Sequence, residues 1–186
     1  RALRYNGRLF SALPFIGGLR RVTKTPNFGP RARSILFALQ RLKEHNRQTG
    51  NRVGQIAEFG VANGEGFRQL VILTMHYCSL HKLPIPYFYG FDTFGGLPET
   101  DDPSDAGQWD TGDYPGDLEQ LNRFMEENNW DRHCRMIKGL FSASLQTMPE
   151  SFSPDFILID CDYYSSTRDV FENLKNKLKS GTLVYF

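Results

Sequence analysis

The chain has few cysteines and no long hydrophobic run. Among its 186 residues, no stretch approaches the about 18 consecutive apolar residues of a membrane-spanning helix. The apolar segment 11–19 is interrupted by proline and glycine, which excludes a continuous signal-peptide core. The cysteines form no C-x-x-C pair, so their spacing does not indicate a zinc site. We therefore expect buried free thiols, no membrane partner and a cytoplasmic location. The cysteines are Cys78, Cys134 and Cys161.

Net charge is also nearly absent. The chain carries 22 basic and 21 acidic residues, for a formal charge of +1. No global attraction to nucleic acid or to a membrane surface follows from this balance, and neither is expected as a partner. The charge is nevertheless uneven, because several arginines precede the first acid, Glu44. We interpret this region as a solvated arm; a basic patch for an anionic partner is the alternative.

Strand and helix patterns alternate along most of the chain. After the irregular segment 1–30, an amphipathic helix begins at Arg31, and 46–51 is expected as a polar turn. The expected strands are 53–59, 87–92, 134–139, 155–160 and 182–186. The expected helices between them are 67–80, 118–128 and 166–179, the last with a capping box at Ser166 and Asp169.

The alternation predicts an α/β fold of the Rossmann-like type, a mostly parallel twisted sheet with helices on both faces. We divide the chain into a basic arm with an amphipathic helix, 1–50, and a Rossmann-like domain, 51–186. The last predicted strand ends at Phe186. Because sites in such sheets lie beyond the strand ends, we expect a chain truncated after its fifth strand.

A glycine loop, EFGVANGEGF, follows the first predicted strand at 58–67. Its spacing, G-x-x-x-G-x-G, does not match the dinucleotide fingerprint, and no Lys-Ser/Thr pair follows to complete a P-loop. Glu58, just before the first glycine, would repel a phosphate. A carboxylate beside a glycine loop suits a cationic ligand such as S-adenosylmethionine, which carries an ammonium and a sulfonium. A tight turn without a ligand is the alternative.

Two further strand ends carry acidic residues. Asp92 closes the second predicted strand, where an acid binds ribose hydroxyls in α/β dinucleotide folds; a turn or cap role is the alternative. Asp160 and Asp162 follow a continuous apolar run, and would point the same way if the strand continues through them. Their oxygens suit magnesium or calcium, with capping as the alternative. None of the four histidines has a recognisable partner, so we assign no general base.

Together these segments resemble the S-adenosylmethionine-dependent O-methyltransferases and, more narrowly, the macrocin O-methyltransferase family. The resemblance rests on four segments in the family's order, 57–67, 89–99, 138–149 and 156–184. It implies that 51–186 is an S-adenosylmethionine-binding domain. The implied cofactor-binding residues are Glu58, Gly60, Val61, Gly64, Asp92, Thr93, Phe141 and Ser142. Asp160 would be catalytic and bind magnesium with Asp162, together with family acids that would follow Phe186.

The sequence therefore predicts S-adenosylmethionine-dependent methylation of a hydroxyl on a small molecule, a sugar or another secondary metabolite. S-adenosyl-L-methionine is the expected cofactor, and magnesium assistance and metal-free transfer both stay open, as does a homo-oligomer. One alternative is a non-catalytic methyltransferase-like binding module. Another is an NAD(P)-dependent oxidoreductase, which the failed fingerprint and Glu58 disfavour. The long loop 95–117, with Trp109 and Tyr114, is expected to be a lid or substrate wall, or else a surface insertion.

Overall fold

The computed structural model describes residues 29–50, 53–107 and 109–186, so the predicted basic arm lies outside the described residues. Five parallel strands form one sheet in the order β3-β2-β1-β4-β5. The strands are β1 (Gln55–Phe59), β2 (Tyr87–Asp92), β3 (Cys134–Lys138), β4 (Phe156–Ile159) and β5 (Leu183–Tyr185). The predicted α/β class and parallel sheet are confirmed.

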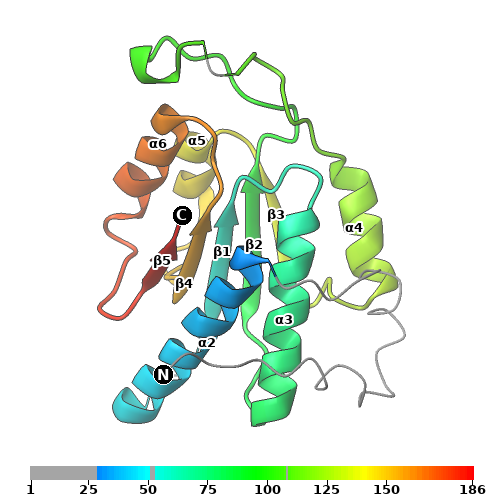
Figure 1. Cartoon of the computed structure of the whole chain (residues 1–186), viewed down its shortest axis with the longest axis vertical. Helices are drawn as coiled ribbons and strands as arrows, with labels where there is room; N and C mark the ends of the chain where they lie inside the picture. The colour runs from blue at the N-terminus through cyan, green and yellow to red at the C-terminus, as the bar shows by residue number, and fades with distance from the viewer. Residues whose placement is uncertain (1–28, 51–52, 108) are drawn as a thin grey trace.

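Helices cover both faces of the sheet (Figure 1). The helices α2 (Pro30–Thr49), α3 (Glu65–His81) and α4 (Leu118–Glu127) contribute to one hydrophobic cluster against the strands. A second cluster on the opposite face includes side chains from α6 (Tyr164–Leu174) and the short helix η3 (Leu145–Thr147), with α5 (Phe141–Ser144) beside them. Because α2 and α3 share the first cluster, α2 belongs to the layer of helices that covers this face of the sheet.

Alternation along β1 explains the position of the buried acid Glu58. Ile56 belongs to the cluster under α2 and α3, whereas Ala57 and Phe59 belong to the opposite cluster. Side chains two residues apart on a strand share a face, so Glu58 points with Ile56 toward α2 and α3. The glutamate is only 1 % exposed, and any partner it has must come from those helices.

Close approaches account for Gly60 in the loop after β1 and for Gly66 in the first turn of α3. Gly60 has a φ of +88°, and a Cβ built there would overlap the backbone carbonyl of Asp160, the first residue after the neighbouring strand β4. A Cβ on Gly66 would lie 2.6 Å from Arg31 Nη2 and 2.9 Å from Glu58 Oε1. The first glycine lets the ends of β1 and β4 approach each other, and the second leaves room for an ion pair.

Several predicted boundaries are wrong. Helix α2 continues to Thr49, through most of the expected polar turn. Helix α6 begins at Tyr164 rather than Ser166 and ends at Leu174, and its own N-terminal residues provide no side-chain cap. Strand β4 ends at Ile159, so the period-2 argument for the two following aspartates does not apply. The start of α6 differs from the prediction because its capping group comes from a distant part of the chain, as shown below.

The remaining expectations on burial are mostly met. All three cysteines are free; Cys78 and Cys134 are buried, whereas Cys161 follows β4 and is partly exposed, contrary to the prediction. Burial raises the pKa of the Cys78 thiol to about 11 and that of Cys134 to about 12. Within the described residues, no helix is both long and apolar enough to cross a membrane.

Candidate active site

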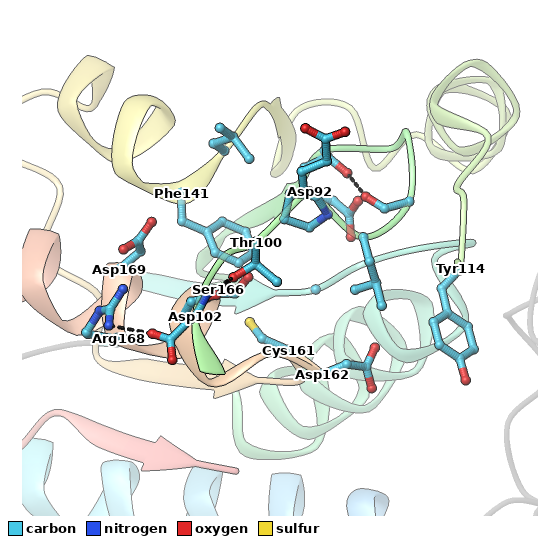
Figure 2. A pocket seen from close by; sticks show the side chains of 18 of the residues that line it. Asp92, Thr100, Asp102, Tyr114, Phe141, Cys161, Asp162, Ser166, Arg168 and Asp169 are labelled. Atoms are coloured by element: carbon cyan, nitrogen blue, oxygen red, sulfur yellow. Dashed lines mark hydrogen bonds and ion pairs between the residues drawn. The ribbon is translucent and has the colours of Figure 1, made fainter. Parts of the chain in front are cut away.

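A cavity of about 700 Å³ opens where the carboxyl ends of β1, β2 and β4 meet the long loop and the start of α6 (Figure 2). The sheet order reverses between β1 and β4, and ligands of open α/β sheets bind at such a point. Six of the predicted site residues line this cavity. They are Gly60, Asp92, Thr93, Phe141, Asp160 and Asp162.

The other predicted residues do not line the cavity. Val61 is 3 % exposed and packs in the hydrophobic core. Gly64 faces Leu121 of α4, because a Cβ there would lie 2.7 Å from Leu121 Cδ1. Glu58 is buried behind the cavity wall, and Ser142 follows Phe141 in α5 without reaching the lining.

Asp92 fastens the glycine loop to the end of β2. One carboxylate oxygen accepts hydrogen bonds from the backbone N–H groups of Val61 and Ala62, each at 2.8 Å. The other oxygen accepts one from the N–H of Phe94 at 2.6 Å. A carboxylate offers about four lone-pair positions, so this arrangement leaves acceptor capacity on a side chain that lines the cavity. Asp92 therefore shapes the loop whether or not a ligand is bound.

Arg31 joins the two other acids of the predicted site. Its Nη2 lies 2.7 Å from Glu58 Oε1, and its Nη1 lies 2.6 Å from Asp160 Oδ2. The second oxygen of Glu58 is buried without a hydrogen-bond partner within the described residues. Burial raises the pKa of Glu58 to about 7, because the loss of solvation outweighs the attraction of Arg31. Sequence reasoning missed Arg31, which it placed in a solvated basic region.

The long loop after β2 is anchored to α6 by Asp105, which is 3 % exposed. The carboxylate of this residue accepts hydrogen bonds from the backbone N–H groups of Tyr164 at 2.6 Å and Ser165 at 3.3 Å. It also accepts one from the hydroxyl of Thr100 at 3.2 Å. Asp105 thus caps α6 from across the sequence, which is why the helix starts before the predicted capping box.

Replacing Asp105 with asparagine is expected to lower the free energy of unfolding by about 2 kcal/mol, because the amide cannot accept all these hydrogen bonds. Chemical denaturation measures this loss. The matched control is Asp110→Asn, an exposed change in the same loop. Equal stability of both variants would contradict the capping role.

The cavity is strongly acidic. Seven acidic side chains and one basic side chain line it within the described residues. The basic one, Arg168, pairs with Asp102 at 2.7 Å (Figure 2). Tyr114 lies at the opposite side of the cavity and packs edge-on against Trp109, with ring centroids 5.3 Å apart. The acids are Asp92, Glu99, Asp101, Asp102, Asp160, Asp162 and Asp169.

Comparison with known proteins decides the family. The sequence pattern of the macrocin O-methyltransferases (TylF) matches residues 35–186, most of the chain. The chain belongs to the macrocin O-methyltransferase family. This confirms the resemblance on which the residue roles were based, although the roles themselves stay predictions. No curated protein sequence matches the chain.

Solved structures support the same fold for this macrocin O-methyltransferase family member. A calicheamicin methyltransferase, CalS11, superposes with a TM-score of 0.63 at 19 % identity, covering 89 % of this chain and 73 % of that one. The O-methyltransferase NovP superposes with a TM-score of 0.59 at 22 % identity, covering 83 % of this chain and 63 % of that one. The chain thus spans about two thirds of the length of these two structures.

The magnesium prediction for Asp160 and Asp162 stays a prediction in this family member. Asp160 is engaged by Arg31, and Asp162 brings the second carboxylate. Within residues 29–50, 53–107 and 109–186, no group of three histidine, cysteine or acidic side chains could hold a metal ion. Magnesium commonly binds through one or two carboxylates and keeps several waters, so the two aspartates by themselves are compatible with the prediction, which stays a prediction.

None of the four histidines lines the cavity. His76 is buried in α3, and His45 lies beside Gly181, away from the strand ends. Asp162, in contrast, lines the cavity. Its pKa is raised mainly by burial and also by the nearby negative charge of Asp160. Among the described residues that line the cavity, carboxylates rather than histidines are therefore the candidate proton acceptors.

Proposed function

We propose that the chain binds S-adenosyl-L-methionine in the cavity and transfers its methyl group to a hydroxyl of a small molecule. One observation carries this proposal. In a chain of an O-methyltransferase family, the cavity lies at the point where the strand order reverses, with the Asp92 carboxylate at the end of β2. The acceptor class, a sugar or another secondary metabolite, follows from the family alone.

The residues of the cavity fit this cofactor. The volume of about 700 Å³ lies within the range of small-molecule and cofactor sites. The unused acceptor capacity of Asp92 suits the ribose hydroxyls, and Thr93 lies next to it on the wall. Phe141 offers an aromatic ring beside this position for the adenine. Gly60 and Asp160 would then border the cationic amino-acid end, where a carboxylate is favourable.

The bound cofactor supplies a methyl group that is already activated by the positive charge on sulfur. The protein must then align the acceptor oxygen with that methyl, and such alignment can contribute about 7–11 kcal/mol to catalysis. We infer that Asp162 accepts the hydroxyl proton, because its carboxylate lines the cavity where the acceptor would bind. The anchored loop forms one side of the cavity.

The charge of the cavity predicts acceptor preference. Because acids outnumber the paired Arg168, an acceptor bearing a phosphate should be disfavoured against its neutral parent by about tenfold or more in kcat/KM. Raising the ionic strength should narrow this difference, since salt screens exposed charges. Steady-state kinetics with a neutral glycoside and its phosphorylated form measure it. A preference for the phosphorylated form would show that the acceptor binds away from these acids.

Calorimetric titration of the full chain with S-adenosylhomocysteine, and in parallel with NAD, tests the proposed cofactor. We expect saturable binding of the first and none of the second. Mass spectrometry of acceptor mixtures should then show a gain of one methyl group. Binding without any methylated product would favour the non-catalytic binding module, and binding of NAD alone would favour the oxidoreductase. Turnover that persists in EDTA would remove magnesium from the mechanism.

A further inference from the structure

Arg31 connects the N-terminal helix to the ends of two central strands. It lies in the first turn of α2, ahead of the βαβ units that build the cavity. Its guanidinium bridges Glu58, the acidic residue of β1, and Asp160, the first residue after β4. The side chain is 22 % exposed, so it contacts both carboxylates from the inner side of the wall rather than from open solvent.

Only one oxygen of Asp160 is held by this contact. Oδ2 pairs with Arg31, whereas Oδ1 accepts no hydrogen bond from the described residues. The Asp160 side chain is 62 % exposed and lines the cavity. An exposed aspartate would otherwise exchange among rotamers, and an ion pair with a planar guanidinium fixes its direction. Arg31 thereby determines which way the free oxygen of Asp160 faces.

The fold reserves space for this guanidinium. Gly66 sits inside the first turn of α3, and a Cβ there would collide with Arg31 Nη2 at 2.6 Å and with its CZ atom, the central guanidinium carbon, at 2.8 Å. Glycine weakens a helix relative to alanine, so its presence within α3 needs a reason. The room it leaves for the Arg31–Glu58 pair provides that reason.

We propose that Arg31 is a positioning residue of the cofactor site. It holds the Asp160 carboxylate so that the free oxygen faces the ammonium group at the amino-acid end of the cofactor. This oxygen keeps its acceptor positions for an N–H donor of the ligand, because Arg31 holds only the other oxygen. This inference rests on the proposed function and adds to it that α2, outside the glycine loop, helps to form the site.

A double-mutant cycle on the full chain tests whether Arg31 acts through Asp160. Calorimetry with S-adenosylhomocysteine should give a loss of about tenfold for Arg31→Ala, as is typical when a group that orients a ligand-binding side chain is removed. Asp160→Asn should cost a similar factor. The double variant should bind no more weakly than either single variant, because both changes remove the same contact. Multiplied losses, or an unchanged affinity in Arg31→Ala, would overturn the proposal.

A second ligand separates positioning from a general structural effect. 5′-Methylthioadenosine keeps the adenosine part but lacks the amino-acid end, so Arg31→Ala should leave its affinity unchanged. Equal losses for both ligands would show a collapse of the site instead of lost positioning. If wild type binds neither ligand, the proposed function fails, and this proposal fails with it. If wild type binds and the variant matches it, only the positioning role fails.

Gly66→Ala offers a steric test that leaves the ionic groups in place. It should weaken S-adenosylhomocysteine binding like Arg31→Ala. In the Arg31→Ala background its further effect should be much smaller, because the two closest contacts of the added methyl, with the guanidinium, are gone and only the 2.9 Å approach to Glu58 Oε1 remains. Should Arg31→Ala prove too unstable, Arg31→Ala with Glu58→Gln removes the unpaired buried charge. The double variant should then bind S-adenosylhomocysteine about tenfold more weakly than Glu58→Gln alone. Equal affinities of these two proteins would overturn the proposal.

Discussion

Replacing Asp92 by asparagine should abolish measurable cofactor binding and lower the free energy of unfolding by about 3 kcal/mol. The carboxylate of Asp92 accepts three backbone hydrogen bonds, two from the glycine loop and one from Phe94. An asparagine side chain has only one oxygen. In either orientation of the amide, its NH₂ group would face at least one backbone N–H that the carboxylate accepts from in wild type. At least one buried donor is left without an acceptor, and the charge that strengthens the remaining bonds is lost.

Calorimetry with S-adenosylhomocysteine and urea denaturation measure both effects on one sample. The control is Asp131→Asn, the same chemical change at an exposed position ahead of β3, which should alter neither quantity. The two effects are separable in principle, because the loop contacts are present without ligand. If stability falls while cofactor affinity stays at the wild-type value, Asp92 organises the loop but does not bind the ribose.

The sequence predicts the sheet well because the necessary signals are local. The apolar run before Asp160 and the aromatic run before Asp92 each give a strand, and helical periods lie between them. Parallel strands then bring their carboxyl ends to one edge, so acids that end two strands must come close together. That argument places Asp92, Asp160 and the glycine loop at one cavity without any knowledge of their contacts.

The contacts that organise the cavity could not be predicted in the same way. Arg31 and Asp160 are separated by 129 positions in the sequence, and Asp105 and Tyr164 by 59. No local period relates such pairs, because they meet only after the sheet and the long loop have folded. The basic composition near Arg31 favours the interpretation of a solvated arm, and the sequence around Asp105 predicts a lid or substrate wall, or else a surface insertion, without indicating its contact with α6. One local signal was available for the Arg31 contact. Gly66 lies inside a helix, where glycine is unfavourable, and this indicates that another group packs closely against it.

Stability should fall as the pH rises from about 5 to about 8, and Glu58 should be responsible for about 3 kcal/mol of the change. Burial raises the pKa of Glu58 from an ordinary value of 4.5 to about 7. Between these values the folded chain binds a proton at this position that the unfolded chain has released. The stabilisation is complete below the unfolded pKa and is lost as the pH passes the folded pKa.

Glu58→Gln isolates this contribution, because glutamine fills nearly the same space and does not titrate. Urea denaturation across the pH range should show a steep decline for wild type and a flatter profile for the variant, which becomes the more stable protein near pH 8. All other ionisable groups are the same in both proteins, so the difference between the profiles reports Glu58 alone. Parallel profiles would mean that Arg31 keeps Glu58 ionised throughout, and that the attraction across 2.7 Å exceeds the cost of burying both charges.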